Sequence, residues 1–274
     1  MAGPQAVPPL FHIAQGDAVA WLRALPAESV DLVITDPPYE SLEKHRAIGT
    51  TTRLKHSKSS SNDWFAIFPN ERFPELFAEV YRVLRRNTHF YLYCDPETMF
   101  VAKPIAEKAG FKFWKPLIWD KRKIGMGYHY RARYECILFF EKGKRKLSDL
   151  GIADILEAPR ISGGYPAEKP STVSEVLIRQ STEPGQLVID PFMGSGSVGV
   201  AAVSTGRWFA GNDLCAEAID ITRGRLRDAG GVDAQRLAAL VGGEPAARPP
   251  GQLGLAGLGA GASGGASGDA GRSG

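Results

Sequence analysis

"VIDPFMGSGSVGVAA", residues 188–202, is the stretch that decides the fold. Together with the two residues before it, its start forms the run "QLVID" (186–190), which predicts a short buried strand ending in Asp190. A turn with two glycines follows, and small residues then predict a helix over 195–205. Glycines let the backbone approach a ligand closely, and a helix N-terminus offers free N–H groups. The pattern indicates a ligand-binding loop in an α/β domain.

The next strand, "RWFAGND" (207–213), ends in Asp213, about twenty residues past the glycines. An acidic residue at this place is suited to accept hydrogen bonds from both hydroxyls of a ribose. Strand, glycine turn, helix, second strand and acid in this order favour a cofactor that contains adenosine. A tight turn that needs glycine only for its backbone geometry is the alternative.

A second strand tip with unusual residues lies in "VDLVITDPPYES" (30–41). Its apolar run predicts a buried strand, which must end at Pro37 because proline cannot donate a hydrogen bond to a sheet. Asp36 and Tyr39 stand on either side of the two prolines. The tip of this strand therefore carries a carboxylate, a rigid corner and an aromatic ring.

The remainder of the chain alternates between strand and helix patterns. Thr172 and Glu175 fit a capping box, and Pro104 indicates a kink or a late start in its helix. Further strands are expected over 11–16, 88–94, 111–119 and 134–140, and helices over 18–25, 71–86, 97–109, 172–181 and 215–229. This alternation predicts an α/β fold with a mostly parallel open sheet and helices on both faces.

Composition divides the chain into one domain over 1–241 and a glycine-rich tail over 242–274 that is expected to be disordered. Residues 40–63 are polar and basic without an apolar period, which is typical of a functional loop. No apolar run reaches the length of a membrane span, and the N-terminus lacks the order of a signal peptide. The three isolated cysteines, Cys94, Cys136 and Cys215, suit a reducing cytosol, argue against a zinc site and favour structural roles.

The net charge of +3 is small, but the positive charges are clustered. Residues 41–61 contain five Lys or Arg against one acid, and residues 121–146 contain nine against Glu135 and Glu141. Histidines and tyrosines lie between them, as in surfaces that follow a phosphate backbone. A solvated basic surface explains the same pattern, and charge alone favours neither interpretation.

Asp36-Pro37-Pro38-Tyr39, together with the segment from Asp190 to Gly196, resembles the DNA amino-methyltransferases. These enzymes use S-adenosylmethionine to methylate the exocyclic amine of adenine or cytosine. The resemblance extends over roughly residues 10–230, and the Asp-Pro-Pro-Tyr motif before the glycine loop is similar to the permuted beta group of the family. It implies a Rossmann-like S-adenosylmethionine-dependent methyltransferase fold.

The resemblance also implies roles for individual residues. "YPAEKP" (165–170) matches the Lys-Pro motif of the group, with Tyr165 in place of the usual histidine. The implied catalytic residues are Asp36, Pro37, Pro38 and Tyr39. The implied cofactor-binding residues are Asp17, Asp36, Lys169, Pro170, Asp190, Pro191, Phe192, Gly194, Ser195, Gly196, Asn212 and Asp213, and no metal is expected.

In the implied mechanism, Asp36 and the Pro37 carbonyl accept the two N–H groups of the target amine, and Tyr39 stacks on the base. The base must leave the double helix to reach this corner. Residues 142–164 form only a short recognition insert in this prediction, so loops, among them the loop 40–63, are expected to contact double-stranded DNA. The candidates are His45, Arg46, Arg53, Lys55, Lys58, Arg122, Lys123, His129, Tyr130, Arg131 and Arg133.

The function predicted on these grounds is methylation of adenine N6 in double-stranded DNA, because relatives that act on cytosine N4 more often carry Ser or Thr at position 36. Cytosine-N4 methylation, an RNA or protein-amide methyltransferase and an inactive DNA-binding regulator remain alternatives. A dehydrogenase is less favoured because Asp190-Pro191-Phe192 precedes the glycines. We expect a homodimer that contacts no membrane and lies with the nucleoid in the cytoplasm, with residues 72–93 as a candidate interface unless they form the core.

Overall fold

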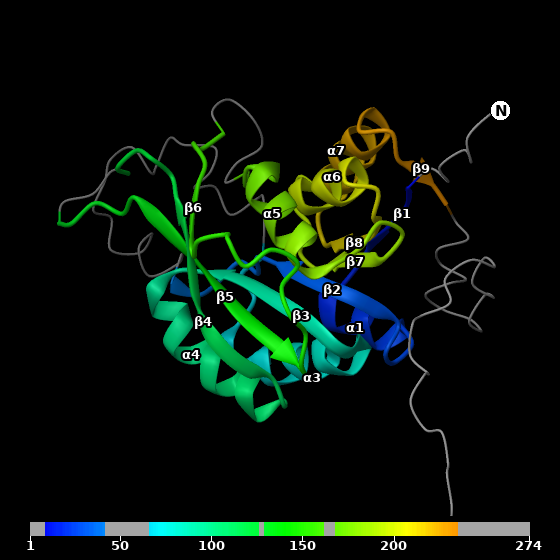
Figure 1. Cartoon of the computed structure of the whole chain (residues 1–274). Helices are drawn as coiled ribbons and strands as arrows, with labels where there is room; N and C mark the ends of the chain where they lie inside the picture. The colour runs from blue at the N-terminus through cyan, green and yellow to red at the C-terminus, as the bar shows by residue number, and fades with distance from the viewer. Residues whose placement is uncertain (1–8, 42–65, 126–128, 162–167, 235–274) are drawn as a thin grey trace, which may run out of the picture. The chain divides into compact units, whose positions relative to one another are not determined.

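The described part of the chain forms a nine-stranded sheet with helices on both faces (Figure 1). The computed structural model describes residues 9–41, 66–125, 129–161 and 168–234. The strands are β1 (Leu10–Gln15), β2 (Val30–Thr35), β3 (Leu84–Cys94), β4 (Lys112–Asp120), β5 (Tyr134–Lys142), β6 (Ile155–Glu157), β7 (Leu187–Asp190), β8 (Trp208–Asp213) and β9 (Val232–Asp233). The helices are α1 (Ala18–Ala24), the 3-10 turn η3 (Asn70–Arg72), α3 (Phe73–Val83), α4 (Pro96–Lys108), α5 (Ser171–Ser181), α6 (Ser197–Ser204) and α7 (Ala216–Asp228).

The strand order is β6-β4-β5-β3-β2-β7-β8-β1-β9. Among the described strands only β5 runs against its neighbours, since it pairs antiparallel with both β3 and β4. All other described pairs are parallel. The mostly parallel open sheet predicted from the sequence is therefore confirmed.

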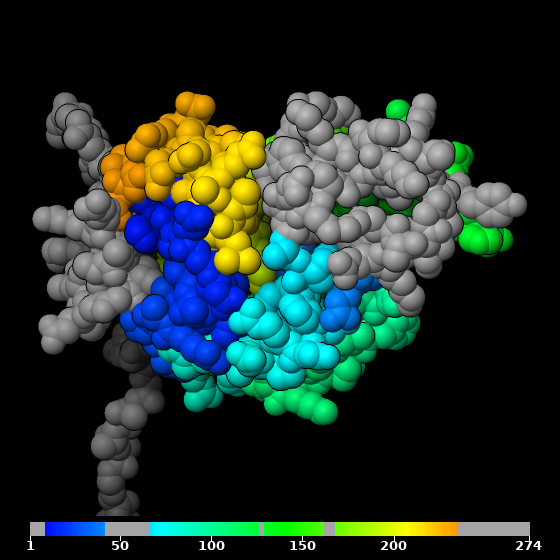
Figure 2. Space-filling view, turned by 180° about the vertical axis from the view of Figure 1, so that it is seen from behind, coloured from blue at the N-terminus to red at the C-terminus, as the bar shows by residue number. Residues whose placement is uncertain are grey.

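Two apolar layers enclose the sheet. Helices α1, α3 and α4 cover one face, and α5, α6 and α7 cover the other (Figure 1). All six residues of β2 are buried, which explains why the apolar residues Leu32, Val33 and Ile34 follow one another instead of alternating with polar ones. From behind, the early part of the chain (blue) lies between residues of α6 and α7 (yellow to orange) and residues of α3 (cyan) (Figure 2).

The aromatic side chains of α3 and β3 belong to this core. Phe73, Phe77, Phe90 and Tyr91 are each at most 1% exposed. They are therefore not available as a dimer interface, and core burial, the other explanation of the aromatic pattern, is the correct one. The prediction of a homodimer itself stays untested.

The sheet brings four strand tips to one edge. β2 and β7 are neighbours with Val33 opposite Ile189, so the residues that follow them lie side by side. β8 lies next to β7, and β1 lies next to β8 with Gln15 opposite Asp213. Because these strands are parallel, their carboxyl ends form one continuous rim, where α/β proteins bind ligands.

Two helix starts differ from the sequence predictions. Helix α4 begins at Pro96 because the Asp95 side chain caps it through the Thr98 N–H, so a late start caused by Pro104 is wrong. Helix α5 begins at Ser171 with Pro170 at its N-cap and no side-chain cap hydrogen bond, so the capping box at Thr172 is also wrong. Both helices lie near the positions expected.

Several predictions lie outside the described residues. They concern the tail 242–274, nearly all of the loop 40–63 and Tyr165, and they include the candidate DNA contacts His45, Arg46, Arg53, Lys55 and Lys58. The described part of 142–164 contains strand β6, which pairs with β4 at the edge of the sheet. No helix in the described parts of the chain is long and apolar enough to cross a membrane. The same parts contain no group of three or more side chains suited to hold a metal ion.

Candidate functional site

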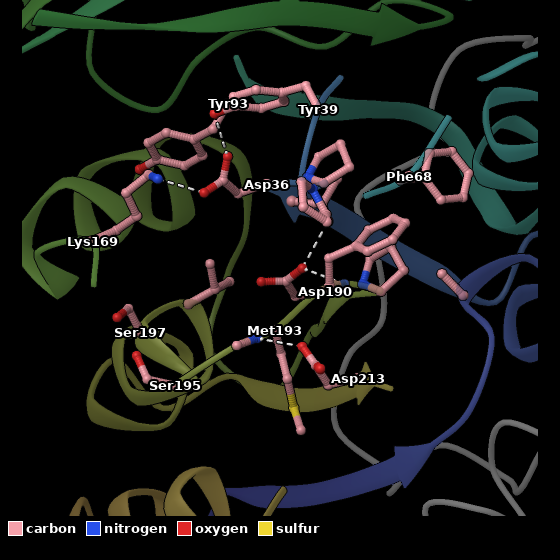
Figure 3. Close-up of a pocket in the computed structure, with 18 of the residues that line it drawn as sticks. Asp36, Tyr39, Phe68, Tyr93, Lys169, Asp190, Met193, Ser195, Ser197 and Asp213 are labelled. Carbon is pink, nitrogen blue, oxygen red and sulfur yellow. Dashed lines mark hydrogen bonds and ion pairs between the residues drawn. The ribbon is translucent and has the colours of Figure 1, made fainter. Parts of the chain in front are cut away.

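A cavity of about 890 Å³ opens at the carboxyl edge of the sheet (Figure 3). This volume suits a small molecule or cofactor. The tips of β2, β7, β8 and β1 line it together with residues at the ends of β3, β4 and β5. Among the predicted catalytic and cofactor residues, all line the cavity except Pro170 and Gly196. Pro170 is instead the N-cap of α5, and Gly196 is the N-cap of α6.

Asp36 follows β2 and holds two hydrogen-bond donors. The Tyr39 hydroxyl donates to Oδ1 at 2.9 Å, and the Lys169 ammonium donates to Oδ2 (Figure 3). Lys169 lies just before α5 and also contacts the Glu135 carboxylate at 3.2 Å. Burial alone would lower the pKa of Lys169, but Asp36 and Glu135 outweigh it and raise this pKa, so the lysine is charged. The resemblance implies a cofactor contact for Lys169, whereas the structure gives its ammonium two protein carboxylates.

The double proline is fixed by a contact from a distant segment. The Phe68 N–H donates to the Pro38 carbonyl at 2.8 Å. Tyr39 is only 7% exposed and packs in the core beneath the corner. Burial first, and the nearby Asp36 charge second, raise the pKa of the Tyr39 hydroxyl, which therefore stays protonated and donates to Asp36. The structure thus gives Tyr39 a supporting role toward Asp36, while stacking on a base stays a prediction.

Asp190, at the tip of β7, ties the two central strands together. Its Oδ1 accepts hydrogen bonds from the Thr35 hydroxyl at 2.7 Å and from the Phe192 N–H at 3.0 Å. Thr35 is the last residue of β2, so this carboxyl group links the Asp36 corner to the glycine loop. Burial raises the pKa of Asp190 to about 7.

Helix α7 holds the glycine loop from behind. Gly196 has φ +77°, and a Cβ there would lie 2.5 Å from Thr222 of α7. The Thr222 hydroxyl donates to the Gly194 carbonyl at 2.8 Å, and Arg225 donates to the Ser195 carbonyl at 2.7 Å. The second glycine is therefore needed for backbone conformation and for close packing, while Gly194 and Ser195 line the cavity.

Asp213 and Asn212, at the tip of β8, form the next part of the wall. The two Asp213 oxygens accept the N–H groups of Gly194 and Cys215, each at 2.9 Å. Burial raises the pKa of Asp213. The Asn212 amide donates to the Gly16 carbonyl at 2.9 Å, while its Oδ1 is buried without a hydrogen-bond partner. This acceptor and the spare lone pairs of Asp213 are suited to bind hydroxyl or amine donors of a ligand.

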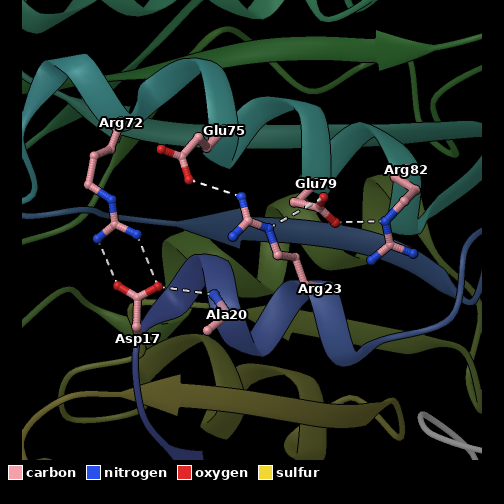
Figure 4. Close-up of polar contacts among 7 residues, drawn as sticks. All are labelled: Asp17, Ala20, Arg23, Arg72, Glu75, Glu79 and Arg82. Carbon is pink, nitrogen blue, oxygen red and sulfur yellow. Dashed lines mark hydrogen bonds and ion pairs between the residues drawn. The ribbon is translucent and has the colours of Figure 1, made fainter.

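Asp17, after β1, is held by an arginine that sequence reasoning missed (Figure 4). Arg72 of η3 donates to both Asp17 oxygens, at 2.7 and 3.0 Å, and the Ala20 N–H donates at 3.0 Å. These bonds, that of Arg72 foremost, lower the pKa of Asp17 to about 2. The Arg72 guanidinium also lies 5.0 Å from the centre of the Phe68 ring, which lines the cavity. No local motif marked Arg72, because the pair joins residues 55 positions apart.

The predicted DNA contacts between β4 and β5 lie at the same edge as the cavity, because these two strands join there. Arg133 forms two hydrogen bonds with Asp120, at 2.7 and 2.6 Å, and Arg122 forms an ion pair with Glu157 at 3.1 Å. These two arginines are thus paired within the protein. The exposed residues of this segment include Arg122, Lys123, His129, Tyr130, Arg131 and Arg133.

Strand β5 divides the basic segment 121–146 in two, because some of its basic residues precede the strand and the others lie at or after the end of the strand. The first half of this segment lies at the cavity edge, and Lys142, Lys144 and Lys146 lie at the opposite end of β5. A strand of this length spans about 30 Å. The two halves therefore do not form one continuous surface.

Comparisons with known proteins agree with this geometry. A family model described as DNA methylase matches residues 30–161 and 151–223. YubD of Escherichia coli K12 is 31% identical over 210 residues, which cover 75% of this chain and 85% of YubD. The DNA adenine methyltransferase YhdJ of the same organism is 28% identical over 267 residues, covering 83% of this chain and 86% of YhdJ.

Solved structures show the same fold. TTHA0409 of Thermus thermophilus superposes with a TM-score of 0.61 at 23% identity, covering 81% of this chain and 96% of that one. The cytosine-N4-specific PvuII DNA methyltransferase superposes with a TM-score of 0.60 at 17% identity, covering 83% and 96%. TTHA0409 has also been solved in complex with S-adenosylmethionine.

The cavity fits the cofactor of such enzymes, S-adenosylmethionine. Its size suits a ligand made of adenosine and an amino acid. The Asp213 carboxylate beside the glycine loop suits an adenosine group, and the unpartnered Asn212 oxygen offers a further acceptor. The chain therefore belongs to the DNA methylase family, transfers methyl groups to DNA and uses S-adenosylmethionine as its methyl donor.

Proposed function

We propose that this DNA methylase acts on the exocyclic N6 of adenine in double-stranded DNA. The observation that carries the proposal is the Asp36 corner, which lies on the same cavity as the glycine loop and Asp213. An aspartate at this position is typical of adenine enzymes, whereas cytosine-N4 enzymes more often have Ser or Thr there. The similarity to a relative named as an adenine methyltransferase supports the same choice.

The chain would bind the amine through two acceptors. Asp36 accepts one N–H, and the backbone carbonyl of Pro37 accepts the other. Acceptors that lie out of the plane of the base draw the nitrogen toward a tetrahedral geometry, so its lone pair becomes localised. The Phe68 N–H on the Pro38 carbonyl holds the corner in place before the base arrives. The rate gain then comes from orientation and fixed dipoles, without a covalent intermediate.

Asp36 begins this reaction with donors already on both oxygens. Each carboxylate oxygen has two lone pairs, so Asp36 can accept the amine N–H while Tyr39 and Lys169 stay bound. The charged Lys169 stays paired with the Asp36 carboxylate while that carboxylate accepts the amine N–H. After transfer the nitrogen carries one proton too many, and Asp36 is the group in contact that accepts it.

The other strand tips would hold the cofactor, which supplies an electrophilic methyl group when bound. Asp213 accepts the ribose hydroxyls, and Asp17 accepts the amine of the cofactor's adenine. Arg72 fixes the orientation of Asp17 through its two hydrogen bonds. Ser195, Ser197 and Val198, at the glycine turn and the start of α6, line the cavity and would hold the remaining part of the cofactor.

The substrate base must be flipped out of the double helix to reach a corner at the rim of the sheet. Flipping costs a few kcal/mol, which stacking and hydrogen bonds in the cavity offset. Exposed basic residues between β4 and β5, such as Lys123 and Arg131, supply phosphate contacts. A second copy of the chain that contributes further contacts is part of this proposal.

The test is transfer of labelled methyl groups from S-adenosylmethionine to unmethylated genomic DNA, followed by mass spectrometry of the nucleosides. We expect N6-methyladenine. N4-methylcytosine would keep the fold and the mechanism but overturn the choice of base, and the similarity to the PvuII enzyme makes this the second candidate. Label found in RNA or protein but not in DNA would contradict the substrate class.

A further inference from the structure

Four charged side chains of alternating sign form a row that ends at Asp36. Lys121 donates to Glu135 at 2.5 Å, Glu135 lies 3.2 Å from the Lys169 ammonium, and Lys169 donates to Asp36. The four residues come from four elements: the end of β4, the start of β5, the segment before α5 and the tip of β2. The four residues lie far apart in the sequence, so no local motif indicated that they form a row.

Burial makes this row energetically important. The side chains of Lys169 and Glu135 are 13% and 23% exposed. Burial alone would raise the pKa of Glu135, but the charges of Lys169 and Lys121 lower it, so Glu135 is ionised. Partly buried charges are screened by water much less than surface charges. Each member of the row therefore influences its neighbours strongly.

We propose that Glu135 is a positioning residue of the methyl transfer, which acts on Asp36 through Lys169. By taking a share of the Lys169 ammonium, Glu135 limits how tightly that ammonium binds Asp36. Asp36 then keeps enough electron density to accept the N–H of the target amine. This inference rests on the proposed function, since it assigns Asp36 the role of the amine acceptor.

The physical argument concerns one cation between two anions. If Glu135 lost its charge, Lys169 would bind Asp36 alone, and the Asp36 carboxylate would become a weaker base. The negative charge of Glu135 also acts on Asp36 directly through the partly buried site, in the same direction. Removing Lys121 has the reverse effect, because Glu135 would then hold Lys169 more strongly and loosen its contact with Asp36.

Other titratable groups also face this row, and the substitutions described below leave these groups in place. They are Tyr39 after β2, Tyr93 and Cys94 at the end of β3, Asp95 at the start of α4, and Asp190 at the end of β7. Tyr93 and Cys94 have pKa values raised by burial, so they are neutral at the pH of the assay. Asp190 titrates in this range, since its pKa is raised to about 7, and its contribution must therefore be measured in the same experiment.

The test compares Glu135→Gln with the wild type and with Glu157→Gln. Glu157 is the matched control, because it is an exposed acid of β6 that pairs with Arg122. For Glu135→Gln we expect kcat to fall about tenfold with the Kd of S-adenosylmethionine changed less than about twofold. The acidic limb of the pH–kcat profile should move down by about one pH unit, while Glu135→Asp should restore most of the activity. Glu157→Gln should match the wild type.

Two further measurements separate positioning from loss of structure and from failure of the proposed function. Lys121→Gln should move the acidic limb in the opposite direction, to higher pH, which a damaged fold would not do. A carboxyl ¹³C NMR titration of Asp36, assigned with Asp36→Asn, should show its pKa lowered in Glu135→Gln even without DNA. Titrations of Asp36 and Asp190 recorded together identify which carboxyl group moves.

The inference is overturned if wild type and Glu135→Gln have the same pH profile and the same Asp36 titration. A raised KM with unchanged kcat would also overturn it, because Glu135 would then be a substrate contact. If the wild type transfers no methyl group to DNA but the Asp36 titration moves as expected, the proposed function fails while the coupling of Glu135 to Asp36 holds.

Discussion

Asp36 is held in a fixed orientation by groups that do not themselves need to touch a substrate. Tyr39 and Lys169 bind its two oxygens, and the Pro38 carbonyl beside it is held by Phe68. We expect Asp36→Ala to abolish methyl transfer, by about a thousandfold or more, because the proposed amine acceptor is lost. Cofactor binding should survive, since Asp17 and Asp213 lie on other strands. Filter assays of transfer and calorimetry of S-adenosylmethionine binding measure the two effects, and equal losses in both would contradict the assignment.

Arg72 gives a second prediction at this scale. Its two hydrogen bonds fix the orientation of Asp17, so Arg72→Ala should weaken S-adenosylmethionine binding about tenfold. Arg23 is the matched control, because it also joins α1 to α3 through Glu75 but carries no contact to Asp17 (Figure 4). Arg23→Ala should leave the affinity unchanged. Equal weakening by both variants, measured by calorimetry, would mean that the α1–α3 contact matters and not the Asp17 clamp.

Residue types at strand tips could be read from the sequence, but their partners could not. Asp36, Asp190 and Asp213 were identified because each follows a clear apolar run. Glycine spacing was less informative, since Gly194, Gly196 and Gly199 have a G-x-G-x-x-G arrangement that dinucleotide enzymes also use. Arg72 and Glu135 escaped notice because their roles depend on side chains that the fold brings from far along the chain.

At the scale of elements, strong periodicity predicted type and position well, and short elements were missed. Strands β2, β7 and β8 each carry three consecutive apolar residues, and α3 carries a clear helical period. Strands β6 and β9 have three and two residues, too few to show any period, and pairing with β4 and β1 defines them. The capping signal at Thr172 did not set the start of α5, because the helix begins at Ser171 with Pro170 as its N-cap.

The contact between β3 and α5 makes stability depend on pH. His89 of β3 is buried, with Nδ1 2.8 Å from the Ser181 hydroxyl of α5, and burial lowers its pKa to about 4. A lowered pKa means that the unfolded chain binds the proton first, near pH 6.5. The contribution of His89 to the free energy of unfolding should therefore be complete above pH 6.5. It should fall by up to about 3 kcal/mol as the pH drops toward 4.

His89→Gln tests this, because glutamine does not titrate. Urea unfolding of both proteins between pH 4 and 8 gives the free energy of unfolding of each. Taking the difference between the two proteins cancels the pH dependence that they share, including that from Asp190. The difference should be constant above pH 6.5 and should shrink in the acidic range. A difference that stays constant over the whole range would show that His89 does not become charged on unfolding.

At the scale of the whole molecule, strand direction decides which charges can meet one DNA duplex. β5 separates the basic segment 121–146 into a half at the cavity edge and a half at the opposite edge. The sequence predicted the basic segment but not its division, because the reversal of β5 is a property of the sheet. In the proposed function, a duplex whose flipped base reaches Asp36 would pass the first half, and the body of the sheet would lie between it and the second.

This arrangement predicts different effects from two matched double variants. Lys123→Gln with Arg131→Gln removes two exposed charges at the cavity edge, and Lys144→Gln with Lys146→Gln removes two at the other edge. The first pair should weaken DNA binding about tenfold and reduce the slope of log K against log salt by about two, one for each lost phosphate contact. The second pair should change neither, although it alters the net charge equally. Fluorescence anisotropy over a salt series distinguishes them, and equal weakening by both pairs would mean that total charge, and not the edge that bears it, attracts the DNA.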